Sequence, residues 1–286
     1  MIYIAISIFL FNILVILFKL FERYDIDNLQ ALLANYIISA CLAFYLAEDF
    51  TSIEQITKSN WIYHSLILGI LFISIFNIYA LGLQKVGIAI TSVINKMSFI
   101  IPVIASTILY TSESLTVGIT IGVSLALIGI YLSSTNNTTF KFDKKYLWLI
   151  MIIFFGQGII DVILNDSKFH IGINENMFFF LTLFISSSIT GVLILLFQNK
   201  IKTIKLKNLG WGILFGIPNF FSIHFFLKAL QSNDFINKSY LIFPLTSVGI
   251  VVTTTLVGVL IYKEVLSKRN ILGIFLAIIS IMIISL

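Results

Sequence analysis

The chain has 286 residues, of which 59% are hydrophobic and 11% are charged, and its mean hydropathy is +1.05. A soluble core of this size cannot hide so much apolar surface, so the composition excludes an ordinary soluble domain and indicates a protein whose solvent is a lipid bilayer. The net charge of +5 comes from the polar breaks between apolar segments, and no basic cluster indicates a nucleic-acid partner.

The whole chain is divided into apolar segments of about 18 to 25 residues, the length that an α-helix needs to cross roughly 30 Å of hydrocarbon. The first segment lacks a basic region before it and a small-residue cleavage site after it, so we expect a retained helix and not a signal peptide. The predicted fold class is an all-α membrane protein with ten transmembrane helices. In chain order these are 2–21, 29–47, 61–83, 86–110, 115–133, 146–164, 176–197, 209–229, 237–262 and 269–286.

The two halves of the chain resemble each other. A shift of 151 residues places Glu113 on Glu264 and Gly122 on Gly273, and it aligns several apolar positions of the fifth helix with the tenth. This predicts two five-helix repeats, 1–135 and 144–286. Because each repeat has an odd number of helices, the second repeat has the opposite orientation in the membrane to the first. Such inverted repeats are the usual construction of secondary carriers.

A second echo pairs the tripeptides Ile94-Asn95-Lys96 and Ile236-Asn237-Lys238. It requires a different shift from its flanking segments, so the sequence alone favours a coincidence. The single cysteine, Cys41, lies in an apolar segment and excludes an intramolecular disulfide.

Two short motifs resemble a known family. They are Tyr79-Ala80-Leu81-Gly82-Leu83-Gln84 at the end of the third helix, and Glu113-Ser114-Leu115-Thr116 with Gly122 beyond. These residues resemble the ten-helix EamA-type permeases of the drug/metabolite transporter superfamily, whose repeats end in a Gly-Glu-x-Leu-like turn and a glycine-containing helix. Ser112-Glu113-Ser114-Leu115 and Lys263-Glu264-Val265-Leu266 fit that turn, although neither keeps its glycine.

Related families refine the resemblance. The segment 248–286 is similar to the last part of small multidrug resistance proteins, but Asn12 is the polar side chain that the first helix offers where those proteins use a glutamate. The resemblance therefore disfavours their proton-coupled export of drug cations. The segment from Ser92 to Lys96 is similar to the Asn-Lys motif of nucleotide-sugar transporters, which implies an anionic group on the substrate.

Loop charges bear on the orientation in the membrane, because lysine and arginine favour the cytoplasmic side. Most basic residues fall in the loops on one side of the membrane, and the rule assigns that side to the cytoplasm. Both termini then lie on the opposite side, whereas the resemblance implies cytoplasmic termini. The orientation stays open. The side with fewer basic residues carries Lys58, Lys168, Lys228 and Lys238.

Polar residues inside the predicted helices are the candidates for function, because a charge at a helix centre costs about 2.5 to 3.5 kcal/mol. Lys96 is the first of them, since counting from Lys85 places it about 16 Å into the membrane, near the midplane. We expect its ammonium to bind a carboxylate or phosphate of the substrate; the structural alternative is an ion pair that joins two helices. The same helix face carries Thr91, Asn95, Ser98 and Pro102.

The sixth predicted helix has its own polar stripe, in which Gln157, Asp161 and Asn165 recur every four residues. Counting from Lys145 places Asp161 about 8 Å nearer the far interface than Lys96, so a direct pair is expected only if the flexible lysine or a water closes the gap. Asp161 is a candidate for coupling transport to protons, and the alternative is a cap on the following turn.

The eighth predicted helix contributes Asn219 and His224 beside Pro218, which should kink the helix and free backbone groups toward a cavity. His224 is a second candidate for proton coupling because histidine titrates nearest neutral pH, and His64 should lie near a membrane interface. The complete predicted substrate-binding set is Lys96, Asn95, Asn77, Asn12, Asn219, His224 and Tyr240.

These features predict a carrier and not an enzyme: a secondary transporter that moves a small polar metabolite, such as an amino acid, by alternating access. Export follows from the resemblance alone. No metal-ligand cluster, phosphate-binding loop or nucleotide-hydrolysing motif is recognised, so no metal, cofactor or catalytic residue is predicted. The expected partners are the solute, the lipid bilayer and protons, in a monomer or homodimer of the bacterial cytoplasmic membrane.

Four alternatives remain open at this point. The chain could export organic cations or exchange organic anions in the manner of nucleotide-sugar transporters. It could also be an intramembrane lipid-modifying enzyme, or an assembly protein that transports nothing. A polar cavity between the two halves would favour a carrier, and a sealed interior would argue against one.

Overall fold

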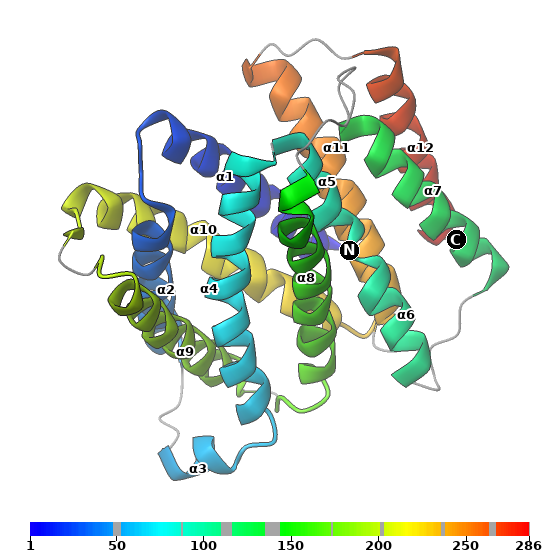
Figure 1. Ribbon diagram of the computed structural model, residues 1–286. Helices are drawn as coiled ribbons and strands as arrows, with labels where there is room; N and C mark the ends of the chain where they lie inside the picture. The colour runs from blue at the N-terminus through cyan, green and yellow to red at the C-terminus, as the bar shows by residue number, and fades with distance from the viewer. Residues whose placement is uncertain are drawn as a thin grey trace.

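The computed structural model describes residues 1–47, 53–86, 88–109, 116–134, 144–172, 174–200, 203–235, 238–262 and 267–285. Every regular element in these ranges is a helix, which confirms the predicted all-α class (Figure 1). The first half contains α1 (Ile2–Arg23), α2 (Asn28–Tyr45), α3 (Ile53–Lys58), α4 (Ile62–Lys85), α5 (Ile88–Met97), α6 (Ile100–Leu109) and α7 (Val117–Ser134). The second half contains η1 (Lys144–Tyr146), α8 (Leu147–Ser167), α9 (Asn176–Phe197), α10 (Leu206–Leu230), η3 (Ser239–Leu241), α11 (Ile242–Tyr262) and α12 (Lys268–Ser285).

Within these ranges, seven helical segments are long and apolar enough to cross a bilayer, so the chain is a membrane protein. They are α1, α2, α4, α8, α9, α10 and the segment Ser239–Val257. The predicted count of ten is therefore not reached. The predicted helix 86–110 is divided into α5 and α6, and α7 and α12 have 18 residues each. A helix of that length spans only about 27 Å, at the lower limit for a membrane crossing.

The break between α5 and α6 follows from Pro102, the third residue of α6. Proline lacks the N–H that would bond to the carbonyl four residues earlier, and its ring collides with that carbonyl. The helix accordingly gives way to a turn at Ser98 and Phe99, and Ile101 N instead bonds to Ser98 O at 2.9 Å. Pro102 thus interrupts the predicted helix 86–110. Pro218, in contrast, lies inside an uninterrupted α10.

Pro244 occupies the corresponding place in the second half, as the third residue of α11, and a short 3₁₀ helix, η3, precedes it. Each proline also follows an Asn-Lys dipeptide by the same number of residues, Lys96 in one half and Lys238 in the other. The two breaks meet in space, since η3 packs against α6. This shared local structure argues against our interpretation of the Asn-Lys echo as a coincidence.

Helix α3 was not expected, because residues 48–60 were assigned to a polar break. It has only six residues and lies beside the start of α4 (Figure 1). The two turns that carry the family resemblance, at Glu113 and Glu264, lie outside the described residues.

Small residues set the closest helix contacts. A Cβ atom added at Gly129 of α7 would lie 2.7 Å from the backbone nitrogen of Ala277 on α12, and Gly273 of α12 approaches Ser133 of α7 as closely. Gly212 of α10 meets the backbone of Ala31 on α2 in the same way. Inside a membrane, such close approach supplies the packing that the hydrophobic effect supplies in water.

The outer surface of the bundle is apolar, and the polar side chains lie inside. Phe9, Ile108 and Phe197 are among the exposed large hydrophobic residues, as suits a lipid-facing surface. Buried serines and asparagines occur on most of the long helices and mainly bond to backbone or to each other across helix pairs. The helices therefore enclose an apolar core in which polar side chains are paired across helix contacts.

We expect Gly212→Ala to destabilise the α2–α10 contact, because its new methyl group would collide with Ala31. Overpacking of this kind costs about 1 to 3 kcal/mol. The measurement is the thermal unfolding midpoint of the detergent-purified protein. Gly210→Ala, two residues earlier on the same helix, is the matched control, since nothing lies within 4 Å of the added Cβ. Equal midpoints for both variants would contradict this packing.

Candidate functional site

A polar cavity of about 120 Å³ lies between helices of both halves, with walls from α1, α4, α5, α8, α10 and α11. That volume holds a cluster of waters or a small solute. Its polar lining comprises Ser7, Asn95, Lys96, Gln157, Asp161, Asn219, Ser222, Thr246 and Ser247, and its apolar lining includes Phe11, Phe72, Phe76, Phe226 and Phe243. Both kinds of wall meet at one place inside an otherwise apolar bundle.

Lys96 is the cationic group of this cavity and lies at the end of α5, next to the break caused by Pro102. Its Nζ lies 3.8 Å from the centroid of the Phe11 ring on α1. A cation over an aromatic face is stabilised by about 2 kcal/mol or more when it is removed from water. Phe11 therefore stabilises the ammonium group inside the bundle.

A second cavity of about 80 Å³ lies against the first and is lined by α1, α4, α5 and α8. Five residues line both cavities, namely Phe11, Phe76, Asn95, Lys96 and Gln157. These side chains form the partition between the two spaces. Movement of Lys96 or of either ring would join the cavities.

A row of side-chain amides connects α5 to the carboxylate of the cavity. Asn95 Nδ2 donates to Gln157 Oε1 at 3.3 Å, and Gln157 Nε2 donates to Asp161 Oδ1 at 3.0 Å. Each amide thus uses its donor toward the next acceptor, which fixes the direction of the row. Of the predicted stripe on α8, Gln157 and Asp161 line the cavity, whereas Asn165 is buried outside its walls.

Lys96 and Asp161 line the same cavity, although counting along the helices placed them at different depths. The depth count assumed straight helices that start at the membrane surface. Instead, Lys85 ends α4, and Lys96 belongs to the separate ten-residue helix α5. The cavity consequently contains one cationic and one acidic side chain, from opposite halves of the chain.

Asn219 of α10 is the other predicted residue in the cavity wall. It is 3% exposed, and its Nδ2 donates to Asn35 Oδ1 on α2 at 3.1 Å. One turn along, Ser222 lines the cavity, and its carbonyl accepts a 2.9 Å bond from Ser7 Oγ on α1. These bonds position α10 against both α1 and α2.

Four predicted residues lie outside the walls of both cavities: Asn12, Asn77, His224 and Tyr240. The amide of Asn12 joins α1 to α11, since it donates to Thr253 Oγ1 at 2.7 Å and accepts from Thr254 Oγ1 at 2.9 Å. His224 is packed among phenylalanines, with its ring stacked on Phe220 at a centroid distance of 6.0 Å. Proximity to Pro218 in sequence did not bring His224 into the cavity.

Several residues of the cavity wall could not be predicted as site residues from the sequence. Ser7, Thr246 and Ser247 carried no signal, because isolated hydroxyls are common in membrane helices and usually bond to their own backbone. The phenylalanine walls were equally hidden among the 27 phenylalanines of the chain. Gln157 was detectable through its helical spacing to Asp161 and deserved a place in the predicted set.

Access of water to the cavity can be tested with cysteine chemistry. In a Cys41→Ser background, Ser247→Cys should react with a small water-soluble methanethiosulfonate reagent, because a thiol must ionise in a hydrated site to react. Ser187→Cys is the control, since that side chain is fully buried between α9 and α4. We expect rates that differ by roughly tenfold or more. The reactions are followed by mass spectrometry. Equal rates for the two variants would mean that the cavity is sealed.

Comparison with known proteins shows a relative in sequence and a structure of similar fold. No family model matches it. The chain is 31% identical over 267 residues to an uncharacterized protein of Haemophilus influenzae, covering 91% of this chain and 89% of that protein. A protein of known crystal structure superimposes with a TM-score of 0.78 over 99% of this chain and 94% of its own, at 13% identity, which establishes similarity of fold alone.

Proposed function

The chain belongs to the same family as the Haemophilus influenzae protein, and from the geometry of its cavity we propose that it is a secondary transporter of a small polar solute. The observation that carries the proposal is a polar cavity in which Lys96 of the first half and Asp161 of the second half face one space. Buried opposite charges are costly unless they are paired or serve a ligand. A site between two halves is where carriers bind their solutes.

The pairing of helices supports two related halves. The contacts of α2 with α10 and of α1 with α10 have counterparts in those of α9 with α4 and of α8 with α4. Likewise, α1 packs on α11 as α8 packs on α5 and α6. Two pairs, α2 with α9 and α7 with α12, are their own counterparts. Exchanging 1–135 with 144–286 therefore leaves most of the packing scheme unchanged.

This symmetry favours the construction expected for an EamA-type permease of the drug/metabolite transporter superfamily, with two inverted five-helix repeats. In that arrangement α6, α7 and α12 also cross the membrane, with α5 and α6 together making one interrupted span. Alternating access would then exchange the conformations of the two halves around Lys96 and Asp161. The location would be the bacterial cytoplasmic membrane, and export would be the direction.

The chemistry of the walls favours an amino acid or a similar solute. An ammonium and a carboxylate in one cavity match a zwitterion, whose carboxylate would meet Lys96 and whose amine would meet Asp161. The phenylalanine walls would contact an apolar side chain. Asn95 and Gln157 would orient the solute through hydrogen bonds from their side-chain amides.

Removal of the Lys96 ammonium is the direct test. We expect Lys96→Ala to lower transport of the responsive solute at least tenfold, because a bond to a charged group contributes about 1.5 to 3 kcal/mol. The assay is movement of labelled amino acids and organic anions in proteoliposomes, with and without a pH gradient. Lys238→Ala is the matched control, since Lys238 has the same Asn-Lys context but is exposed. Unchanged transport in Lys96→Ala, or none by wild type across the panel, would refute the proposal.

Asp161→Asn separates coupling from binding. If Asp161 carries the coupled proton, the amide variant should no longer accumulate solute in response to a pH gradient, yet should still exchange labelled for unlabelled solute at equal pH. Both activities are measured in the same proteoliposomes. Retention of the pH-driven accumulation would exclude Asp161 as the coupling group.

An organic-cation exporter is the second candidate, and the aromatic walls are the observation that favours it. Five phenylalanines and one carboxylate in a cavity suit a delocalised cation, through contact with ring faces. Lys96 disfavours it by repulsion. Transport of a lipophilic cation that increases in Lys96→Ala would support this candidate over the amino-acid carrier.

A further inference from the structure

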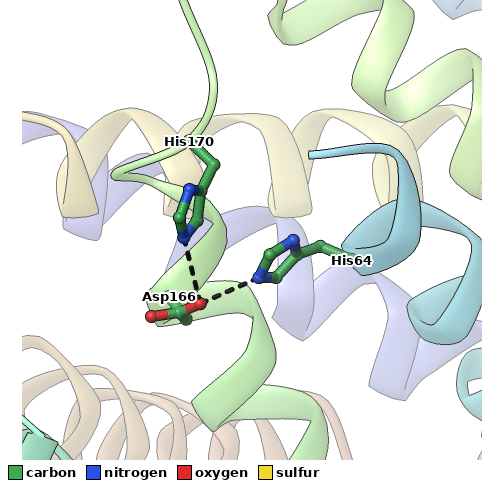
Figure 2. Close-up of side chains that lie close together, drawn as sticks. All are labelled: His64, Asp166 and His170. Atoms are coloured by element: carbon green, nitrogen blue, oxygen red, sulfur yellow. Dashed lines mark hydrogen bonds and ion pairs between the residues drawn. The ribbon is translucent and has the colours of Figure 1, made fainter. Parts of the chain in front are cut away.

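Two of the three histidines in the chain meet one carboxylate away from the cavity (Figure 2). His64 lies in the first turn of α4, Asp166 near the end of α8, and His170 in the turn that follows α8. Both histidines point their Nε2 atoms at the same oxygen, Asp166 Oδ2, at 2.8 Å from His64 and 3.4 Å from His170. Nothing in the proposed transport cycle uses this cluster.

The local structure brings these three side chains together without strain in the chain. Asp166 and His170 are four residues apart, and the backbone bond from His170 N to Ser167 O at 3.0 Å continues the helical turn, so both lie on one face. His64 reaches them because α4 packs against α8. The imidazole rings are stacked, with centroids 4.8 Å apart and planes at 28°. Stacking aligns their Nε2 atoms on the same side.

The spacing suits a small divalent ion. All three candidate ligand atoms lie within 4.8 Å of one another. A tetrahedral Zn²⁺ with bonds of about 2.0 to 2.1 Å separates its ligands by about 3.3 to 3.4 Å. The distance from Asp166 Oδ2 to His170 Nε2 already has that value. Binding would require a slightly longer distance from Asp166 Oδ2 to His64 Nε2 and a shorter distance between the two Nε2 atoms.

The ligand types narrow the choice of metal. Two imidazoles and one carboxylate suit Zn²⁺, Co²⁺, Ni²⁺ or Cu²⁺, whereas Ca²⁺ and Mg²⁺ prefer oxygen alone. The side chains of His64, Asp166 and His170 are 21%, 35% and 39% exposed. Water can therefore reach the cluster and supply a fourth ligand, as in zinc sites with three protein ligands.

We propose that His64, Asp166 and His170 form a binding site for a first-row divalent transition metal, with Zn²⁺ the best fit. The site joins α4 of the first half to α8 of the second half, at the end of the bundle where α4 begins. Both helices contribute walls to the cavity, α4 through Phe72 and Phe76 and α8 through Gln157 and Asp161. A bound ion would hold these two walls together and so raise the thermal stability of the protein.

The test uses full-length protein purified without a polyhistidine tag. Wild type should bind one Co²⁺ per chain with the visible absorption band of tetrahedral coordination, and Zn²⁺ should displace it. Zn²⁺ should also raise the thermal unfolding midpoint. His170→Gln, the most exposed of the three positions, should weaken binding roughly tenfold or more, and His64→Gln should do the same.

His224→Phe is the matched control, because it removes the remaining histidine, which is packed among aromatic rings elsewhere on α10. It should retain full metal binding. The proposal is overturned if folded wild type shows no saturable binding of Co²⁺ or Zn²⁺, or if His64→Gln with His170→Gln binds as tightly as wild type. In the first case the cluster is a hydrogen-bonded tie between α4 and α8. Each readout is independent of transport, so the transporter proposal can fail while this one stands.

Discussion

The ammonium group of Lys96 must be accommodated inside a bundle whose outer surface is apolar, and much of the interior follows from that constraint. A charge in such a place requires aromatic faces, amides or an opposite charge around it. The chain supplies all three, with Phe11 at 3.8 Å, the amide row from Asn95 to Gln157, and Asp161 across the same cavity. The cavity exists because these polar groups cannot be packed as a hydrocarbon core.

Outside the cavity, polar side chains do a different task. Asn12 with Thr253, Ser39 with Gly216 O and Ser187 with Gly69 O each join two helices through a hydrogen bond. Glycines at the same interfaces let the backbones approach closely enough for these bonds to form. The described interior thus contains helix pairs tied by small polar contacts and, separately, the cavity in which Lys96 and Asp161 lie.

The two helix breaks show how internal repetition and function are related. Pro102 and Pro244 each stand third in a helix, and each follows an Asn-Lys dipeptide at the same distance. Yet Lys96 ends a helix beside the cavity, whereas Lys238 is exposed. Related local sequences give each half a break before a proline-containing helix but unequal positions for the lysines, because Lys96 belongs to α5 whereas Lys238 directly precedes η3. An asymmetric site can therefore arise from two related halves.

The sequence by itself determined the class of the protein. Long apolar segments, the glutamate and glycine matches between halves, and the lone Lys96 and Asp161 in their spans were readable because each is a local property of composition or helical spacing. Helix interruption was also predictable at Pro102, from the covalent structure of proline.

Only the tertiary structure decided which of these residues meet. Asn12 and His224 met every local criterion for a site but lie outside the walls of both cavities, while Ser7, Thr246 and the phenylalanine walls met none and line the first cavity. His64 and Asp166 are far apart in the chain and formed no recognisable metal motif, yet their atoms lie 2.8 Å apart. Depth cannot be counted from Lys85 to Lys96 along one straight helix, because α5 is a separate short helix. Contacts between helices depend on how breaks, tilts and small residues combine over the whole bundle, and helical periodicity contains no record of them.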